Sequence, residues 1–472
     1  MVIMSIILTR QLWFPSPVNI LGLGGKAGKD SDKTVIEERK NIISPKTIVV
    51  SFGAGDRKKN YYTILSHNID SAWDQSKNIL EDYFLGDPEI IPIEHDIYVQ
   101  ANTLKSIELE FGDNMPSVLI SSVFDSLDNK IIKNIKEIKK ILIPAFNQGI
   151  IYIMAGGKDD IYEVRLYNHA QDTSLVGFID ELENKEFIKY HPISSLFDEL
   201  GESYTVMPVN YTLITKQIFV ESEIDIKNEV VLRERAKSFF NENFDFVKTI
   251  RETGGAVVYI YGYGEKSLRI NNRGILEYNE EIGNISSTNI LTSLDAAVGF
   301  IRENGGFPEG IYLKHIQDIT NNQNKGYRFS FGYRIGGFPI EFDRNKVKYP
   351  IEIEVYGNKV KTYHNLVRKA MNMQEINSEQ KILYFPNIIE KNIKHLELQY
   401  SDNKNQSGEK IEDEEKILRI LSDIEEVRLV YFDTAERQRV QLLKPSWMVK
   451  IKNSIYYFDG YTGEFIDKFM LN

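Results

Sequence analysis

The hydrophobic pattern changes its period along the chain, which predicts a mixture of strands and helices. Thr47–Phe52 is rich in β-branched residues and predicts a strand, and Ser71–Phe84 has the apolar spacing of a helix that Gly86 ends. Gly149–Met154 and Ile161–Tyr167 flank a glycine turn and predict a hairpin. This mixed α+β pattern runs to about residue 241, and we expect a helix around residues 231–240 to close it.

After residue 255 the pattern changes to a helix followed by strands. Apolar residues recur from Leu294 to Ile301 at the spacing of one helix face. A meander of alternating segments follows, at Tyr327–Tyr333, Phe338–Phe342, Ile351–Tyr356 and Lys359–Tyr363.

In the first of these strands an aromatic face alternates with a polar one. The aromatic residues are Tyr327, Phe329, Phe331 and Tyr333, and the residues opposite include Arg328, Ser330 and Arg334. This alternation is typical of a strand between a core and water, so we expect the aromatic face to be buried and the polar face to be exposed. An aromatic groove for a sugar or a peptide is the other interpretation.

The last hundred residues repeat the order. Leu396–Tyr400 has a strand pattern, and apolar residues from Ile417 to Ile424 have helical spacing. Strands are then predicted at 427–431, at 440–442 and around Trp447 and Tyr456. Each unit is therefore predicted to be a helix followed by a four-stranded antiparallel meander.

A shift of 96 residues superimposes two hairpins of these units. It places Ile351, Ile353 and Val355 on Trp447, Val449 and Ile451, and the turn Gly357-Asn358 on Asn453-Ser454. The preceding prolines, Pro350 and Pro445, differ by 95 residues, so the match needs a one-residue slip. Duplication and a chance likeness between two similar segments both remain open.

The chain of 472 residues exceeds what one hydrophobic core usually organises. We predict an α+β protein of three domains, in which an N-terminal mixed α+β domain precedes two topologically similar helix-plus-antiparallel-meander domains. The expected boundaries are 1–44 for a membrane-helix remnant with a flexible linker, 45–250 for the N-terminal domain, 251–375 for the central domain and 376–472 for the C-terminal domain.

The N-terminal residues have an apolar run before Arg10, followed by an aromatic segment. A membrane span needs about 20 apolar residues, so Met1–Leu8 is interpreted as the last part of a membrane helix. Aromatic residues are typical of the exit from such a span. A frayed N-terminus is the alternative. The predicted membrane-anchor and partner-contact residues are Ile6, Ile7, Leu8, Leu12, Trp13 and Phe14.

Charge and composition exclude several classes of protein. The formal net charge is −11 and no basic cluster is present, which argues against a nucleic-acid partner. The chain has no cysteine, so disulfides, thiolate catalysis and cysteine metal sites are excluded.

No motif carries the spacing of a catalytic, cofactor or metal site. The seven histidines never occur three or four residues apart. The glycine-rich segment Gly22–Lys29 lacks the spacing of a phosphate loop and has Asp30 where a Ser or Thr is needed, so it is interpreted as part of a flexible tether to Asn41. The sequence predicts no catalytic residue, no cofactor and no metal.

Several motifs, taken in order, resemble the YycH family. They are LTRQLW at Leu8–Trp13, GILEY at Gly274–Tyr278, YRFSFGYRIGGFPI at Tyr327–Ile340, IEIEVYGNKVKTY at Ile351–Tyr363 and SWMVKIKNSIYYFDGYTGE at Ser446–Glu464. The resemblance covers nearly the whole chain, and the C-terminal hairpin also looks like a PepSY-type module.

The resemblance implies an accessory regulator of the WalK/WalR two-component system, which controls cell-wall homeostasis. Members of the family have one N-terminal membrane span and an extracytoplasmic three-domain body, whose second and third domains are similar to the related YycI protein. The implied partners are a WalK-like sensor histidine kinase, a YycI-like protein and the membrane. We therefore expect a non-enzymatic regulator at the cell membrane, with a soluble or wall-associated peptide- or polysaccharide-binding module as the alternative and a hydrolase as a third, weaker one.

Overall fold

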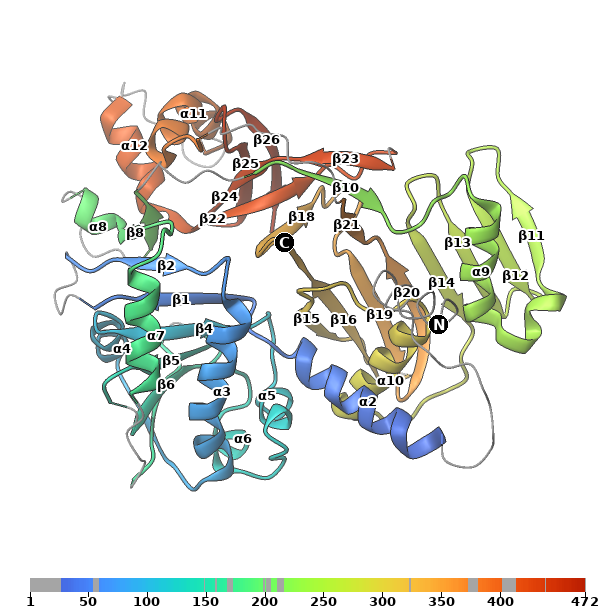
Figure 1. Ribbon diagram of the computed structural model, residues 1–472, viewed down its shortest axis with the longest axis horizontal. Helices are drawn as coiled ribbons and strands as arrows, with labels where there is room; N and C mark the ends of the chain where they lie inside the picture. Colours follow the sequence, from blue (N-terminus) through green and yellow to red (C-terminus); the bar gives the residue numbers. More distant parts are fainter. Residues whose placement is uncertain are drawn as a thin grey trace, which may run out of the picture.

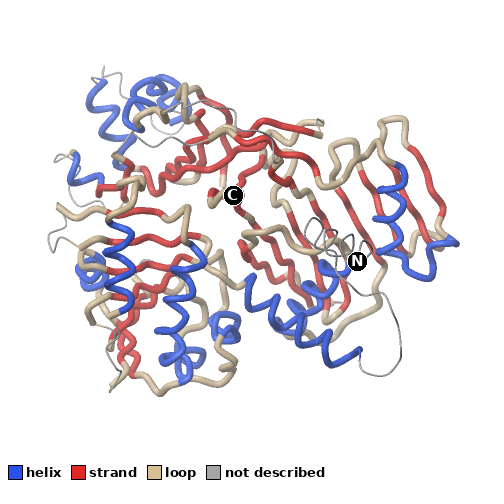
Figure 2. The backbone as a smooth tube through the Cα atoms, viewed as in Figure 1, coloured by secondary structure: helices blue, strands red, loops and turns tan. Residues whose placement is uncertain are grey.

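The strands of the chain form three large sheets and one small sheet (Figures 1 and 2). The structure is a computed structural model that describes residues 27–53, 59–147, 149–157, 159–167, 173–197, 200, 205–209, 216–321, 324–371, 381–400, 413–437 and 439–471. Helices cover the large sheets, so the protein is α+β, as predicted.

The N-terminal part of the chain forms a nine-stranded sheet in which each neighbouring pair is antiparallel. In sheet order the strands are β3 (Glu89–Pro92), β7 (Ile161–Arg165), β6 (Ile150–Met154), β5 (Lys140–Pro144), β4 (Ser106–Glu110), β1 (Thr47–Ser51), β2 (Tyr62–Ile64), β8 (Tyr190–Pro192) and β9 (Val206–Pro208). Its helices are α3 (Ile69–Leu85), α4 (His95–Asn102), α5 (Ser117–Val123), α6 (Lys130–Asn134), α7 (Ser174–Glu183) and α8 (Ile193–Leu196).

Both faces of this sheet are covered. Ile141 and Ile143 of β5 belong to the main core, whereas Leu142 between them packs with Tyr98 of α4. Alternate residues of a strand point to opposite faces, so α4 lies on the face opposite α3 and α7 (Figure 1). The strand predicted at 47–52, the helix predicted at 71–84 and the hairpin of β6 and β7 are confirmed.

The central part forms an eight-stranded antiparallel sheet. In sheet order its strands are β11 (Lys248–Arg251), β12 (Val257–Tyr261), β13 (Lys266–Ile270), β14 (Leu276–Glu280), β20 (Lys359–Asn365), β19 (Ile351–Tyr356), β16 (Gly326–Gly332) and β15 (Tyr312–Asp318). Helices α2 (Ala27–Ile42), α9 (Glu229–Phe240) and α10 (Ile290–Glu303) lie on one face of it, and the short 3-10 helix η2 (Asn241–Phe246) follows α9 (Figure 1).

The aromatic face of β16 is buried, as predicted. Phe329 and Phe331 are 0% exposed, and α10 packs on the same sheet. The interpretation as an aromatic binding groove is therefore wrong, because a groove needs accessible rings.

The C-terminal part forms a six-stranded sheet, covered by α11 (Phe385–Tyr400) and α12 (Asp413–Ser422). In sheet order the strands are β17 (Arg334–Ile335), β18 (Phe338–Phe342), β22 (Ile424–Asp433), β24 (Pro445–Ile451), β25 (Ser454–Asp459) and β26 (Phe465–Met470). The pair β18 and β22 is parallel, and the other pairs are antiparallel. The strand predicted at Leu396–Tyr400 is wrong, because these residues end α11.

The central and C-terminal sheets share a topology, as predicted. Helix α10 precedes four neighbouring strands in the order β15, β16, β19, β20, and α12 precedes β22, β24, β25, β26. The strands that make up each sheet differ from the prediction in one respect: the expected second strand of each unit pairs in a different sheet. β18 joins β22 of the C-terminal sheet, and β23 (Val440–Leu443) joins a separate sheet. The C-terminal hairpin turns at Lys452-Asn453, one residue before the predicted turn.

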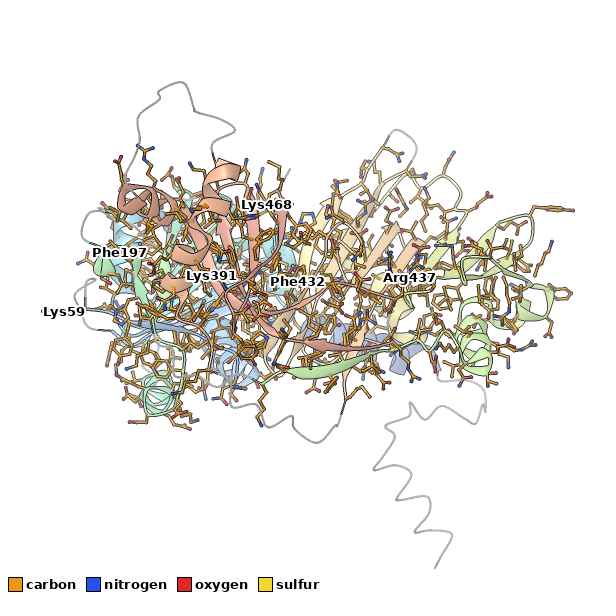
Figure 3. The ribbon with its side chains drawn as sticks, turned by 90° about the horizontal axis from the view of Figure 1, so that it is seen from above. Lys59, Phe197, Lys391, Phe432, Arg437 and Lys468 are labelled. Carbon is orange, nitrogen blue, oxygen red and sulfur yellow. The ribbon has the colours of Figure 1, made fainter. Side chains whose placement is uncertain are left out.

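A small sheet joins the three parts. Its order is β21 (Arg368–Ala370), β10 (Ile218–Ser222) and β23, so each strand comes from a different predicted domain. Figure 3 shows the loop before β23, marked by Arg437, extending from the six-stranded sheet, marked by Phe432, towards the eight-stranded sheet. Helix α9, expected to close the N-terminal domain, packs instead on the eight-stranded sheet, where the rings of Phe239 and Tyr278 are 5.3 Å apart. The domain boundaries stay predictions.

The predicted flexible tether is wrong over most of its described length. Residues Ala27–Ile42 form α2, which packs against α10. Arg39 Nη1 donates to both carboxylate oxygens of Asp295 at 2.8 Å, and Arg39 is 8% exposed. Glycine and charge in this segment indicated a linker, but the bidentate ion pair and the buried Ile42 fix it to the body.

Candidate functional site

Charged side chains gather where the three large sheets meet. We call this set the charged junction; it consists of Lys46, Glu110, Lys314, Arg334, Glu341, Glu426 and Arg428. In Figure 1 the blue strands β1 and β2 lie next to the red strand β22, with β18 beside them. Each sheet contributes to the junction, because Lys46 precedes β1, Lys314 lies in β15 and Arg428 lies in β22.

Most of these charges are paired, and the pair of Lys314 with Glu341 crosses a sheet boundary. Lys314 Nζ of β15 donates to Glu341 Oε1 of β18 at 2.7 Å, and both residues are under 10% exposed. Lys46 Nζ lies 3.2 Å from Glu110 Oε1. Arg428 Nε lies 3.2 Å from Glu426 Oε1, and its Nη2 lies 3.9 Å from Glu341 Oε1. Removing one partner of such a buried pair leaves an uncompensated charge, so the pair of Lys314 and Glu341 holds the eight-stranded and six-stranded sheets together.

The pairing outweighs burial in setting the ionisation of the junction. Burial alone would raise the pKa of Glu341, but the charges of Lys314, Arg344 and Arg428 lower it to about 2. Burial would lower the pKa of Lys46, but Glu110 and Glu426 raise it above its ordinary value. Glu341 and Lys46 are therefore ionised at neutral pH.

Arg334 is different, because its charge has no carboxylate partner among the described residues at ion-pair distance. It is 9% exposed, and its Nη2 donates to the carbonyl oxygens of Pro45 and Lys46 at 2.7 Å each. The guanidinium lies 4.4 Å from the ring centroid of Tyr312. Burial lowers the pKa of Arg334. The two backbone carbonyls and the face of the Tyr312 ring stabilise this cation where another buried arginine would have a carboxylate.

The turn after Arg334 is pressed against the N-terminal sheet. Gly337 has φ +82°, and a Cβ there would lie 1.6 Å from the carbonyl oxygen of Ser66. Only glycine permits both this backbone conformation and this approach. The hairpin of β17 and β18 is therefore fixed to the segment that precedes α3.

A small pocket opens beside Arg334. Its volume is about 30 Å³, and strands of the nine-stranded and six-stranded sheets or their flanking residues line it. The lining residues are Lys46, Thr47, Ile64, Leu65, Ser66, Ile188, Tyr190, Arg334, Gly337, Phe338, Pro339, Arg428 and Leu429.

A second ionic contact joins the small sheet to the C-terminal sheet. Arg368 Nε of β21 donates to Asp433 Oδ2 of β22 at 2.9 Å, and both side chains are 0% exposed. The Tyr333 hydroxyl accepts a hydrogen bond from the Arg368 N–H at 2.9 Å. Arg368 Nη1 and Nη2 are buried without a hydrogen-bond partner in the described part of the chain. The guanidinium therefore depends on Asp433.

The predicted anchor residues Ile6, Ile7, Leu8, Leu12, Trp13 and Phe14 lie outside the described residues. Among the helices that are described, none is both long enough and apolar enough to cross a membrane. Within the described ranges, no three His, Asp or Glu side chains gather in a way that could hold a metal ion.

Sequence reasoning missed the charged junction. Arg334 was expected to face water, yet it is buried, because the N-terminal sheet and the ring of Tyr312 cover that side of the strand. One signal was available: Glu341 is the single charge of β18, and Arg428 is the single charge of the apolar run 427–432. A charge flanked by apolar residues on both faces indicates a strand buried on both sides, where the charge needs a partner.

Comparisons with known proteins identify the fold. No family model matches the sequence, and no curated protein matches it. Among solved structures, YycH from Bacillus subtilis is similar over 88% of this chain and 95% of its own, with 13% identity and a TM-score of 0.50.

Two weaker likenesses accompany it. An uncharacterised protein from Eubacterium rectale is 14% identical over 57% of this chain and 92% of its own, with a TM-score of 0.34. The YpeB C-terminal domain from Bacillus megaterium is 14% identical over 52% of this chain and 98% of its own, with a TM-score of 0.23. The fold resemblance predicted from the motifs is confirmed: the chain has a YycH-like, multi-domain α+β fold.

Proposed function

We propose that the chain is a non-enzymatic regulator of a WalK-type sensor histidine kinase and acts through protein–protein contacts. The observation that carries the proposal is the likeness to YycH along nearly the whole of both chains. On this proposal the body lies on the extracytoplasmic face of the cell membrane. The residues Ile6, Ile7, Leu8, Leu12, Trp13 and Phe14 belong to its membrane anchor, and a YycI-like protein is a further partner.

The way in which α2 is attached supports a mechanical role. The bidentate contact of Arg39 with Asp295 and the buried Ile42 join α2 to the eight-stranded sheet. A displacement of the body is therefore passed to the residues before α2, instead of being absorbed by a flexible linker. A partner that prefers one arrangement of the body can shift the kinase only by its difference in affinity between arrangements.

The test is co-purification of the full chain with the sensor kinase from membranes, together with kinase autophosphorylation. A variant with Ile7→Asp and Leu12→Asp is expected to lose both association and regulation, because each buried carboxylate costs about 2.5–3.5 kcal/mol in a membrane helix. Lys33→Glu, on an exposed position of α2, is the matched charge-changing control and should associate normally. Undiminished association of the double variant would contradict the anchored regulator.

A second variant tests transmission from the body. Asp295→Ala removes the partner of Arg39 and is expected to leave association intact while changing the autophosphorylation rate, because α2 is then released from α10. If the rate stays at the wild-type value while α2 is released, as judged by protease cleavage within residues 27–42, transmission through α2 is wrong.

The alternative, a peptide- or polysaccharide-binding module, rested on aromatic stripes that form a groove. Phe329 and Phe331 are 0% exposed, so the stripe of β16 gives it no support.

A further inference from the structure

We propose that the pocket beside Arg334 binds the carboxylate group of a small anion. This inference rests on the proposed function only for its regulatory consequence, and the binding itself is independent of any kinase.

The lining of the pocket is positive. It includes three cationic residues, Lys46, Arg334 and Arg428, and contains no Asp or Glu. Lys46 and Arg428 have carboxylate partners outside the lining, at 3.2 Å in each case. Arg334 has none at ion-pair distance among the described residues, and Asp70 acts on it only from farther away, so the wall of the pocket carries one positive charge without a direct carboxylate partner.

The charge of Arg334 is buried, so a bound anion would stabilise it. Arg334 is 9% exposed, and a buried ion costs several kcal/mol unless a counter-charge or strong hydrogen bonds offset the loss of water. The carbonyls of Pro45 and Lys46 supply part of that compensation at 2.7 Å. An anion in the pocket would supply the remaining counter-charge in surroundings where charge pairs are strong.

A second arginine of the lining has hydrogen-bonding capacity to spare. Arg428 is 6% exposed, and its Nε makes no hydrogen bond within the described part of the chain, although Glu426 Oε1 lies 3.2 Å away. Its Nη1 lies 3.5 Å from Thr47 Oγ1, a long contact. Thr47 also lines the pocket, so an incoming oxygen could bond to this hydroxyl and to the guanidinium together.

Size and geometry favour a carboxylate. A water molecule needs about 10–15 Å³ of such volume, so about 30 Å³ accommodates a group of two or three heavy atoms. Because both Nη2 hydrogens of Arg334 already bond to carbonyls, Arg334 and Arg428 would each donate one charge-assisted hydrogen bond to the two oxygens of a carboxylate.

The position of the pocket gives binding a structural effect. Lys46 and Thr47 lie at the start of β1 in the nine-stranded sheet, whereas Arg334 of β17 and Arg428 of β22 belong to the six-stranded sheet. A carboxylate held by all three would stabilise the arrangement in which they converge, and not one in which they are apart. The ligand would therefore favour the arrangement in which the nine-stranded and six-stranded sheets are in contact at the pocket.

The experiment measures thermal unfolding of the full chain in acetate and in chloride at equal ionic strength and pH. Acetate is expected to raise the melting temperature in a saturable way, whereas acetamide, its neutral isostere, is not. N-acetylalanine and its amide form a second pair of probes that separates a free small acid from a peptide C-terminus. A shift with both acids means a general carboxylate site, and a shift with N-acetylalanine alone means a peptide carboxylate.

Variants assign the effect to Arg334. Arg334→Met should abolish the acetate-dependent shift, and Arg334→Lys, which keeps the charge but loses the fork, should weaken the apparent affinity by about tenfold, as expected for the loss of one charge-assisted hydrogen bond. The control Arg251→Met removes an exposed arginine of β11 and should leave the shift unchanged. If Arg334→Met does not fold, the weaker acetate-dependent shift expected of Arg334→Lys is the test.

Two results would overturn the proposal. One is a melting temperature of the wild type that neither acetate nor N-acetylalanine raises above its value in chloride, confirmed by the absence of binding heat for both acids in calorimetry. The other is an acetate shift that persists undiminished in the folded Arg334 variants. Because no kinase is present, failure here leaves the kinase proposal intact, and failure of kinase co-purification leaves the carboxylate site intact.

Discussion

Asp433→Asn is expected to destabilise the protein strongly, because it removes a charge and little else. The side chain is 0% exposed, and its Oδ2 accepts from Arg368 Nε at 2.9 Å. Its Oδ1 accepts from the Ala435 N–H at 2.7 Å, a bond that the amide oxygen of Asn can keep. The change therefore isolates the loss of the counter-charge of Arg368.

The expected loss is about 3–5 kcal/mol in the free energy of unfolding, the range for removing one member of a buried ion pair. Arg368 then has a buried charge with no compensation, since its Nη1 and Nη2 already lack hydrogen-bond partners in the described part of the chain. Adding Arg368→Met to Asp433→Asn removes the stranded charge, so the double variant should be more stable than Asp433→Asn alone.

The assay is equilibrium urea unfolding followed by tryptophan fluorescence. Trp447 is 2% exposed and lies in β24, next to the strand that carries Asp433, so it reports on this sheet. The matched control is Glu415→Gln, which breaks an exposed pair with Arg419 at 3.0 Å and should cost under about 0.5 kcal/mol. A loss below about 1 kcal/mol for Asp433→Asn, or a double variant less stable than the single one, would refute the reasoning.

Three further outcomes are expected. Phe329→Ala should cost about 3–5 kcal/mol of stability in urea unfolding, because the ring is 0% exposed; a value near zero would mean that the aromatic face is accessible. Gly337→Ala should lower the melting temperature more than Gly336→Ala, since both have positive φ but only the first Cβ meets the Ser66 carbonyl, at 1.6 Å; equal effects would contradict the close approach. The pKa of Glu341 is lowered to about 2 from 4.5, so its contribution of about 3 kcal/mol is present above pH 4.5 and is lost as the pH falls towards 2. When the free energy of unfolding is measured against pH, Glu341→Gln should be less stable than the wild type at pH 7 and should lose less stability between pH 4.5 and pH 2. The same slope of stability against pH in both proteins would count against the ionised pair.

Local periodicity predicted elements whose neighbours in sequence are also their neighbours in space. The spacing of Leu294 to Ile301 identified α10, and the hairpins of β6 with β7 and β24 with β25 followed from alternation and turn residues. The strand prediction at Leu396–Tyr400 failed because an alternation of three apolar residues is too short to distinguish a strand from the end of a helix, and α11 begins at Phe385, well before that segment.

Long-range placement could not be read from the sequence. β18 has the same alternating pattern as a meander strand, but the residues of its parallel partner β22 lie 91 positions later, and no local residue encodes that choice. The charged junction depends on the same kind of placement, because Lys46, Lys314 and Arg428 come from three sheets. Only the isolated charges in apolar strands indicated that buried partners exist, and they did not say which.

The small sheet of β21, β10 and β23 constrains how the polypeptide can be made and divided. β10 leaves the ribosome about 150 residues before β21 and about 220 before β23. The backbone groups along its two edges therefore do not all have a strand partner until synthesis is nearly complete. Unpaired edges invite association with other chains. A fragment that stops before residue 440 would expose one edge of β10 permanently, which makes truncated versions of this protein prone to aggregation even where every remaining domain is intact.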